Sequence, residues 1–357
     1  MWKERIIFVH MKIEEDYSIK KHTTFGIDAD VSYYVEYDSE EELKELIESG
    51  FLLDREVLAL GGGSNILFCD DFDGVVLHSE IKGMEIVERT EDSVLVKVGA
   101  GEVWDDFVAW TITQGFYGAE NLSDIPGSVG ATPVQNIGAY GVEAKDLIER
   151  VECVDTKSAY TVTFENQELS FGYRDSAFKH DLKGLFIVTR VYYRLSLLPS
   201  FKLDYGTIRD ELQGSETSLQ TVRDAVIRIR KSKLPDPSVT GNAGSFFKNP
   251  VISNDRYEEL LEEYPSMPHY DVKNGVKIPA AWLIEQCGWK GRSQGRAAVC
   301  ESQPLVLINT GGAYGHEILE LSEEIRESVR QRFGIEISPE VILVAAPQED
   351  PSDSLTR

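Results

Sequence analysis

Hydrophobic and polar residues follow two periods along this chain, and each period predicts one kind of element. Apolar residues that alternate with polar ones, or that form short β-branched and aromatic runs, predict strands. These strands are expected at residues 31–37, 74–78, 93–98, 151–155, 159–164, 186–195 and 306–309, and residues 56–68 are expected as strand, turn and strand. Apolar residues recurring every three or four positions predict helices, at residues 39–50, 102–114, 219–231, 257–264, 279–287 and 316–333.

The order of these elements favours an α+β fold. Strands and helices are mixed without regular βαβ alternation, which argues against a doubly wound parallel sheet. Two stretches, 122–141 and 233–250, are rich in Gly, Pro and Asn and are expected to be irregular. The polar tail 348–357 is predicted to be disordered. Residues 1–10 either form a tail or precede a more natural start at Met11.

Composition and charge narrow the function classes. A chain of 357 residues is long enough for two or three domains. Its 61 acidic and 36 basic residues give a net charge of −25, which disfavours nucleic acid and anionic membranes as partners. An anionic ligand would need a local basic patch, and RIRKSK at 228–233 supplies one, although such cations also suit a helix C-terminus.

Cysteines and apolar runs give no sign of a metal site, a membrane span or export. The four cysteines form no CxxC pair, so no metal is expected and a reducing, cytoplasmic location is favoured. No run approaches the roughly 20 apolar residues of a membrane span. A signal peptide is not expected either, because no small-residue cleavage site follows the short apolar run near the start.

The stretch GGGSNILF at 61–68 is the first candidate for ligand binding. A dinucleotide-binding Rossmann turn needs GxGxxG opening a helix. Gly61 and Gly63 fit this pattern, but Ile66 takes the third glycine position and a strand is expected next. The Rossmann interpretation therefore fails. A plain tight turn and a nest of backbone N–H groups that binds an anion both stay open.

A second glycine-rich loop, IPGSVGATPVQNIGAYG at 125–141, favours ligand binding. Its four glycines and two prolines leave backbone exposed to close approach. A loop this long without its own secondary structure is more often functional than idle. Two such loops in one acidic chain predict a large cofactor that carries phosphate.

Six motifs occurring in order carry a family resemblance. They are HTTFGID (22–28), GGGSNILF (61–68), IPGSVGATPVQNIGAYG (125–141), FGYRDS (171–176), KLPDP (233–237) and GNAGSFFKNP (241–250). Together they resemble the UDP-N-acetylenolpyruvoylglucosamine reductases, the flavoenzymes of peptidoglycan synthesis, over about residues 17–344. The segment LDYGTI at 203–208 is similar to the branch of the family with a tyrosine-bearing substrate loop.

The resemblance implies a fold and a reaction. Residues 11–81 and 82–220 would form a two-part FAD-binding module of the vanillyl-alcohol-oxidase type, and 221–343 an α+β substrate domain, with tails at 1–10 and 345–357. NADPH would reduce non-covalently bound FAD, which would then reduce UDP-N-acetylglucosamine enolpyruvate to UDP-N-acetylmuramate. We expect a monomeric, cytoplasmic enzyme, although the oligomeric state does not follow from the residues. Preference for NADPH over NADH does not follow from the residues themselves.

The resemblance also implies roles for individual residues. The catalytic groups would be Arg174 on the substrate carboxylate, Ser245 as proton donor to C2, and Glu340, which would polarise the intermediate. The FAD contacts would be Gly61, Gly62, Gly63, Ser64, Asn65, Pro126, Gly127, Ser128, Gly130, Ala131, Ile137, Gly138, Tyr140 and Val188. The substrate contacts would be Tyr173, Tyr205, Arg230, Lys233, Asn249, Lys290 and Gln303. Without the motifs, Arg174 would be read as a salt bridge to Asp175, Ser245 as a turn residue and Glu340 as solvated surface.

Two departures and two rival functions complete the picture. Arg296 stands where the family usually has Gly, and Cys300 where it usually has His. One rival is a flavin oxidase of the same fold, for which His22 is the only candidate flavin tether near the first glycine motif. The other is a non-catalytic nucleotide-binding module. The three intact catalytic positions argue against that second rival.

Overall fold

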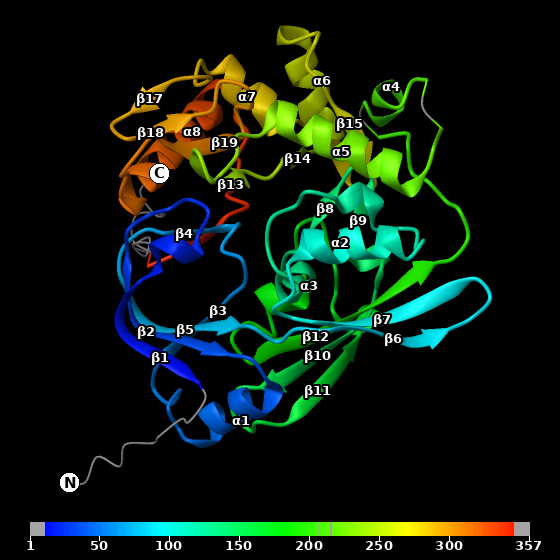
Figure 1. Cartoon of the computed structure of the whole chain (residues 1–357). Coiled ribbons are helices and arrows are strands. Elements are labelled where there is room, and N and C mark those ends of the chain that lie inside the picture. Colours follow the sequence, from blue (N-terminus) through cyan, green and yellow to red (C-terminus); the bar gives the residue numbers. More distant parts are fainter. Residues whose placement is uncertain (1–10, 206, 215, 346–357) are drawn as a thin grey trace. The chain divides into compact units, whose positions relative to one another are not determined.

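The computed structural model describes residues 11–205, 207–214 and 216–345 (Figure 1). The chain divides into two compact units. Unit 1 takes the described residues of Met1–Tyr17, Val31–Gly63 and Asp73–Lys233. Unit 2 takes those of Ser18–Asp30, Ser64–Phe72 and Leu234–Arg357. The chain therefore passes between the units several times. The three-domain division at 81/82 and 220/221 stays a prediction, and the last crossing in the structure comes at Leu234.

The first sheet of unit 1 has the strand order β1-β2-β5-β3, with β3 and β5 parallel. The strands are β1 (Lys12–Ser18), β2 (Asp30–Tyr37), β3 (Glu56–Leu60) and β5 (Phe72–Ser79). Helix α1 (Glu40–Glu48) buries Leu43 and Leu46 against Val35 and Val75 of this sheet. Ser39 caps α1, because its side chain accepts a hydrogen bond from the backbone N–H of Glu42.

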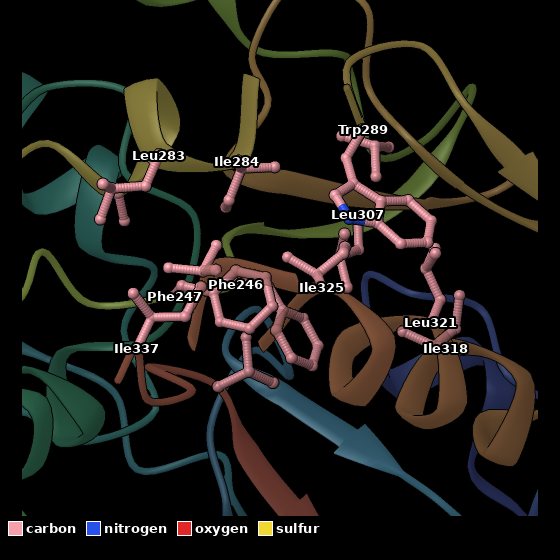
Figure 2. Packing of buried hydrophobic residues seen from close by; sticks show 14 of the residues in the cluster. Phe246, Phe247, Leu283, Ile284, Trp289, Leu307, Ile318, Leu321, Ile325 and Ile337 are labelled. Atoms are coloured by element: carbon pink, nitrogen blue, oxygen red, sulfur yellow. The ribbon is translucent and has the colours of Figure 1, made fainter. Parts of the chain in front are cut away.

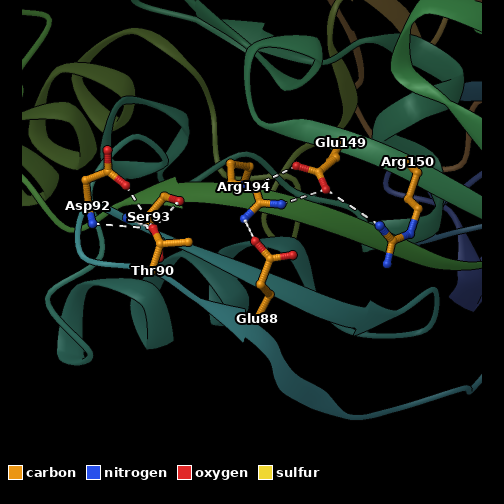
Figure 3. A network of polar contacts seen from close by, with 7 residues as sticks. All are labelled: Glu88, Thr90, Asp92, Ser93, Glu149, Arg150 and Arg194. Atoms are coloured by element: carbon orange, nitrogen blue, oxygen red, sulfur yellow. Dashed lines mark hydrogen bonds and ion pairs between the residues drawn. The ribbon is translucent and has the colours of Figure 1, made fainter.

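The second sheet of unit 1 is antiparallel, with the order β11-β10-β12-β7-β6. Its strands are β6 (Met84–Arg89), β7 (Ser93–Gly99), β10 (Ile148–Asp155), β11 (Thr161–Glu165) and β12 (Phe186–Ser196). Helix α2 (Trp104–Thr113) covers one face, where Trp104 and Phe107 pack their rings 5.6 and 4.9 Å from that of Tyr193. A polar network includes Arg194 of β12, Glu149 of β10 and Glu88 of β6 (Figure 3).

Short elements and two helices complete unit 1. Within and beside the stretch expected to be irregular lie η2 (Glu120–Leu122), η3 (Val129–Ala131), α3 (Thr132–Gln135), β8 (Gly138–Ala139), β9 (Val142–Glu143) and η4 (Ala144–Asp146). Two further 3-10 turns are η5 (Asn166–Glu168) and η6 (Ala177–Lys179). Helices α4 (Ile208–Glu211) and α5 (Leu219–Lys233) then pack together through Ile208, Val222 and Val226, with Tyr140 against them.

Unit 2 is built around one large apolar core (Figure 2). Its main sheet has the order β13-β19-β18-β17, from β13 (Gly241–Ser245), β17 (Ser293–Gln294), β18 (Ala297–Val299) and β19 (Val306–Asn309). A second sheet joins β14 (Val251–Ile252), β16 (Gly275–Lys277) and β15 (Tyr270–Val272), and β4 (Ile66–Phe68) pairs in parallel with β20 (Ile342–Val344). The helices are η1 (Ile19–His22), α6 (Asn254–Glu263), α7 (Ala280–Gln286) and α8 (Gly315–Phe333). Phe246, Phe247, Leu283 and Ile325 are nearly inaccessible to solvent in this core.

The predicted helices are all present, but the strand prediction is incomplete. The expectation of an irregular segment over 233–250 is wrong in part, because β13 pairs with β19 within it. Strand β6 was not predicted, because most of its residues are exposed and no burial period results. Strands β14 to β18 have only two or three residues each, too few to show a period. The predicted tails at 1–10 and 348–357 lie outside the described residues.

Candidate active site

The two glycine-rich loops lie against each other within unit 1. Gly61 and Gly62 follow β3 and pass directly beside the second loop. A Cβ added to Gly62 would lie 2.8 Å from the Gly127 Cα, and one added to Gly61 would overlap the Ser128 hydroxyl. Gly63 has a φ of +61°, a conformation that favours glycine. The glycines of the first loop are therefore required by close approach to the second, which a simple tight turn would not explain.

The second loop is tied to the sheet behind it by backbone hydrogen bonds. The Trp104 N–H donates to the Gly127 carbonyl at 3.0 Å, and the Gly130 N–H donates to the Ala100 carbonyl at 2.9 Å. The Val129 N–H donates to the Glu102 backbone carbonyl at 2.8 Å. These contacts hold the loop at the junction of β7 and α2. The loop is consequently an ordered part of the fold whose backbone is pre-positioned.

Arg174 is held against the same loop. Its guanidinium donates to the carbonyl of Gly138 and, at 3.5 Å, to that of Asn136. Arg174 and Asn136 both have left-handed backbones, with φ of +54° and +44°. The side-chain amide of buried Asn136 donates to the Gly172 carbonyl at 2.7 Å, which links the two segments. Left-handed non-glycine residues are strained, and such strain is concentrated at functional sites.

A second guanidinium, that of Arg230 on α5, belongs to this part of unit 1. Its side chain is 15% exposed, and its Nε donates to the Asp124 carbonyl at 3.0 Å. Burial lowers the pKa of the Arg230 guanidinium. The nearby Tyr140 and Asp124 act to raise this pKa, and the positive charge of Arg174 lowers it further. Arginine stays protonated despite such shifts. Arg174 and Arg230 thus place two positive charges beside this part of unit 1, with the Asp124 carboxylate 3.9 Å from Arg230 Nε.

The remaining cations of the basic patch differ in their surroundings. Arg228 is exposed and pairs with Glu211 at 2.5 Å, so it has a structural partner on α4. Lys233 is the last residue of α5. Tyr205 is half-exposed. A Cβ added to Gly141 would lie 3.4 Å from the Tyr205 Cβ, so Tyr205 flanks the end of the second glycine-rich loop.

Ser245 and Glu340 come together in unit 2. Ser245 ends β13, and the next residue, Phe246, accepts a hydrogen bond from the Glu340 N–H at 2.7 Å. The side-chain amide of Asn65 donates to the Glu340 carbonyl at 3.2 Å, and the Ile342 N–H donates to Asn65 at 3.0 Å. Three predicted site residues separated by up to 275 positions are thus neighbours.

The other predicted residues of unit 2 have local roles in the fold. The Asn249 side-chain oxygen accepts from the Ala280 N–H at 2.9 Å, which orients this amide at the start of α7. Exposed Lys290 pairs with Glu285 at 2.8 Å. The Gln303 side-chain oxygen accepts from the Leu305 N–H at 3.4 Å. The structure does not bring Lys290 or Gln303 into a described contact with Ser245 or Glu340.

The predicted residues are divided between the units. Unit 1 holds Gly61, Gly62, Gly63, Pro126, Gly127, Ser128, Gly130, Ala131, Ile137, Gly138, Tyr140, Tyr173, Arg174, Val188, Tyr205, Arg230 and Lys233. Unit 2 holds Ser64, Asn65, Ser245, Asn249, Lys290, Gln303 and Glu340. Unit 2 also has a pocket of about 690 Å³, lined by residues from Thr23–Gly26, 237–241 and 308–311. None of the predicted site residues lines that pocket.

Comparison with known proteins identifies the family. The chain is 51% identical to a UDP-N-acetylenolpyruvoylglucosamine reductase of Bacteroides fragilis over 331 residues, which cover 92% of this chain and 99% of that protein. The chain belongs to the UDP-N-acetylenolpyruvoylglucosamine reductase family. A reductase of the same name from Porphyromonas gingivalis is 47% identical over 93% of this chain and 99% of its own length.

Family models and a solved structure agree with this membership. Residues 31–163 match the FAD binding domain model, and residues 236–344 match the C-terminal domain model of UDP-N-acetylenolpyruvoylglucosamine reductase. The crystal structure of this reductase from Thermus caldophilus covers 94% of the chain with a TM-score of 0.67 at 24% identity, and so shows the same fold. The predicted α+β class, an FAD-binding module followed by an α+β domain, is confirmed.

The residues of unit 1 fit the FAD that the family requires. The two loops approach so closely that a Cβ at either Gly61 or Gly62 would fill the space between them. Gly127, with a φ of +133°, likewise adopts a conformation suited to glycine. Such backbone-lined surfaces let a pyrophosphate approach N–H groups without a Rossmann helix. This geometry is compatible with FAD contacts from Gly61–Gly63 and the second loop, and these contacts stay a prediction.

Of the two departures from the family pattern, Arg296 has a local explanation and Cys300 has none. Arg296 pairs with Glu317 at 2.9 Å and lies over the Tyr314 ring at 4.4 Å. Because Glu317 also accepts from the Tyr314 N–H at 2.8 Å, Arg296 supports the start of α8. Cys300 is buried, with its sulfur 3.2 Å from the Ser302 hydroxyl. Nothing in the structure explains why Cys300 stands where the family usually has histidine.

Two residues with supporting contacts were not predicted. Asn136 holds the Arg174 segment, and Asp124 contacts Arg230. Both lie in or beside the second glycine-rich loop, and both have a left-handed backbone. Their residue types tolerate that conformation, which was the available signal.

Across the described ranges, no helix is long and apolar enough to cross a membrane, and no group of three His, Cys, Asp or Glu could hold a metal ion.

Proposed function

We propose that this protein uses NADPH and bound FAD to reduce UDP-N-acetylglucosamine enolpyruvate to UDP-N-acetylmuramate, in the synthesis of peptidoglycan precursors. Its activity is that of a UDP-N-acetylmuramate dehydrogenase. The observation that carries this function is the match to reductases of this name over nearly their whole length, at 51% identity for the Bacteroides protein. Both the FAD-binding model and the reductase C-terminal model match the chain.

The reaction makes definite demands on the protein. The substrate is an enol ether conjugated to a carboxylate, so hydride adds at C3 and negative charge develops on C2 and the carboxylate. Bound FAD supplies the hydride that originates from NADPH. The protein must bind the carboxylate, stabilise the developing charge and deliver a proton to C2.

Arg174 is the proposed carboxylate ligand. A guanidinium binds a carboxylate through two parallel hydrogen bonds and remains charged at all relevant pH values. Its position is set before the substrate arrives, because the Gly138 and Asn136 carbonyls orient it. The contacts with the Gly138 and Asn136 carbonyls support a pre-organised role for Arg174.

Ser245 and Glu340 are proposed to act on C2. Ser245 would donate the proton, and Glu340 would polarise the intermediate from the opposite side. Their support is the backbone contact of Glu340 with Phe246, which places two segments far apart in sequence beside each other. Gly244, with a φ of +68°, comes just before Ser245, where the pairing of β13 with β19 shifts in register.

The nucleotide diphosphate is proposed to bind the basic group on α5. Arg230 and Lys233 would neutralise the phosphates, and Tyr205 and Asn249 would donate hydrogen bonds. Partly buried Arg230, whose pKa the positive charge of Arg174 helps to lower, supports this, since both cations are stabilised when an anion binds. Tyr173, Lys290 and Gln303 are proposed as further substrate contacts.

One experiment separates the proposed function from its rivals. Protein purified with FAD is mixed anaerobically with NADPH, and the flavin absorbance is followed. The expected result is bleaching by NADPH and recovery of the yellow colour on addition of the enolpyruvyl sugar nucleotide. A non-catalytic nucleotide-binding module would not bleach, and an oxidase would recover its colour with oxygen but not with the sugar nucleotide. Failure of the sugar nucleotide to restore the colour would refute the proposal.

We further propose that the enzyme acts as a monomer in the cytoplasm and serves cell-wall growth, cell shape and cell division. NADPH and sugar nucleotides are charged compounds of that compartment, which supports the location. Light scattering coupled to size-exclusion chromatography measures the mass in solution. A dimer mass would rule out the monomeric state and leave the reaction unaffected.

A further inference from the structure

A chain of polar contacts connects helix α2 to the basic residues of α5. Asp105, in the first turn of α2, accepts two hydrogen bonds from the Arg223 guanidinium at 2.6 and 2.7 Å. The same carboxylate accepts a hydrogen bond from the Asp124 N–H at 2.6 Å. The carbonyl of Asp124 in turn accepts from Arg230 Nε at 3.0 Å. All four residues belong to unit 1.

Asp124 is the link in this chain that needs external support. Its φ is +61°, a left-handed conformation that aspartate tolerates better than most residues but that contacts are still needed to hold in place. The bond from its N–H to Asp105 holds the residue on one side, and the Arg230 guanidinium holds it on the other. Two positions later begins the stretch 126–131, whose residues pack against Gly61 and Gly62. The conformation of Asp124 therefore affects both Arg230 and the start of the second glycine-rich loop.

We propose that Asp105 is a positioning residue for nucleotide binding: by fixing the Asp124 backbone, it sets the orientation in which Arg230 meets the substrate diphosphate. This inference rests on the proposed function, because it takes Arg230 to be a diphosphate ligand. Asp105 itself does not contact the reacting atoms. Arg223 orients the Asp105 carboxylate and neutralises it, so the positioning contact adds little net negative charge beside an anionic ligand.

A purely electrostatic role for Asp105 predicts the opposite effect. Removing its carboxylate would take one negative charge away and leave the Arg223 charge unpaired, which would attract a diphosphate more strongly. Loss of positioning would instead weaken nucleotide binding, because Arg230 would lose its fixed acceptor. The direction of the change in affinity therefore distinguishes the two roles.

A purely structural role, in which the ion pair only joins α2 to α5, needs a matched control. Glu149 on β10 accepts two hydrogen bonds from Arg194, at 2.6 and 2.8 Å (Figure 3). The Glu149 and Asp105 side chains are both 29% exposed. Neither Glu149 nor Arg194 was placed in the candidate site. Glu149→Ala thus removes a bidentate pair of similar length and exposure without touching the nucleotide-binding residues, while Arg194 keeps Glu88 as a partner at 2.7 Å.

The test uses holoenzyme reduced anaerobically by NADPH and then mixed with increasing concentrations of the enolpyruvyl sugar nucleotide. Saturation of the reoxidation rate gives an apparent dissociation constant and a limiting rate. We expect Asp105→Ala to raise the dissociation constant about 10-fold, a change that corresponds to one lost hydrogen bond to a charged group. The limiting rate should stay within about twofold, because Arg174, Ser245 and Glu340 keep their contacts. Glu149→Ala should change neither quantity.

Two further variants make the test complete. Asp105→Asn keeps a side-chain oxygen that can accept from the Asp124 N–H, so it should recover most of the affinity. Arg223→Met leaves that acceptor but releases its orientation, so a smaller loss of affinity is expected. Arg223→Met also serves if Asp105→Ala does not fold. In that case, an Arg223→Met affinity equal to that of wild type overturns the inference.

Other outcomes are equally decisive. Tighter binding by Asp105→Ala, or an affinity no weaker than that of Glu149→Ala, overturns the positioning role. The same holds if Asp105→Asn binds as weakly as Asp105→Ala. If wild-type protein bleached by NADPH is not reoxidised by the sugar nucleotide, the proposed function itself has failed. A failure confined to the variants concerns Asp105 alone.

Discussion

Replacing Gly62 with alanine should weaken FAD binding more than it weakens the fold. The new Cβ would lie 2.8 Å from the Cα and 3.2 Å from the carbonyl carbon of Gly127. Carbon atoms in favourable contact lie about 3.5–4.0 Å apart, so one of the two loops must move by several tenths of an ångström. The obstacle is backbone, which has no rotamer to change, and it is held by the hydrogen bond from Trp104.

The magnitude follows from that overlap. Inserting a methyl group into packed backbone costs about 1–3 kcal/mol. Flavin-free protein can lower part of this cost by shifting the Gly127 segment, whereas binding FAD requires the segment to return. If the whole cost falls on binding, FAD affinity decreases by roughly 5- to 150-fold. Titration of flavin-free Gly62→Ala with FAD, followed by flavin fluorescence, measures this change.

A matched control is available at Gly184, where φ is +72° and an added Cβ would meet nothing within 4 Å. Gly184→Ala should destabilise the protein by about 1–2 kcal/mol through backbone strain alone and leave FAD affinity unchanged. At Gly61 the clash is with the Ser128 hydroxyl, so Ser128→Ala should restore part of the affinity lost in Gly61→Ala. Equal FAD affinity for Gly62→Ala and Gly184→Ala would refute the proposed cofactor cradle.

Three further predictions concern catalysis, substrate binding and pH. Ser245→Ala should slow the reoxidation of reduced enzyme by the substrate by roughly 10²- to 10⁴-fold and leave reduction by NADPH unchanged. Ser245→Cys should recover part of the reoxidation rate. Equal slowing of both steps, measured by stopped-flow, would rule out the proton-donor role. Lys233→Ala and Tyr205→Phe should each cost about 2 kcal/mol of substrate binding, seen as a higher Michaelis constant, and unchanged constants would reject both contacts. Burial acts to raise the pKa of Asp105, but hydrogen bonds from Arg223 and the Asp124 N–H lower it overall. The contribution of Asp105 to the free energy of unfolding is therefore complete above about pH 4 and is lost as pH falls through the lower folded-state pKa. Urea unfolding of Asp105→Asn as a function of pH should not show this loss. Identical pH profiles for the variant and the wild type would contradict the prediction.

The elements and much of the site could be predicted because their signals are local. Helix α1 carries its cap and its apolar stripe within twelve residues, 39–50, and the structure keeps both. The glycine-rich loops were identifiable because few other residues tolerate such close backbone contact. Strand β13 was not predicted, since its sequence GNAGS has no apolar alternation and its pairing with β19 provides the order. Strand pairing between distant segments leaves little trace in either segment alone.

The sequence by itself determined the helical and strand periods, the acidic charge, the basic patch and the motifs that place the chain in its family. Only the tertiary structure decided which partner and what degree of burial each cation of that patch, and of the helix α5 that contains it, has. Arg228 pairs with Glu211 at the surface, Arg223 pairs with Asp105, and Arg230 is partly buried beside the second glycine-rich loop. Asp105 and Arg223 lie 118 positions apart. Their different environments depend on which distant acid reaches each guanidinium, and folding decides this through packing that no local pattern records.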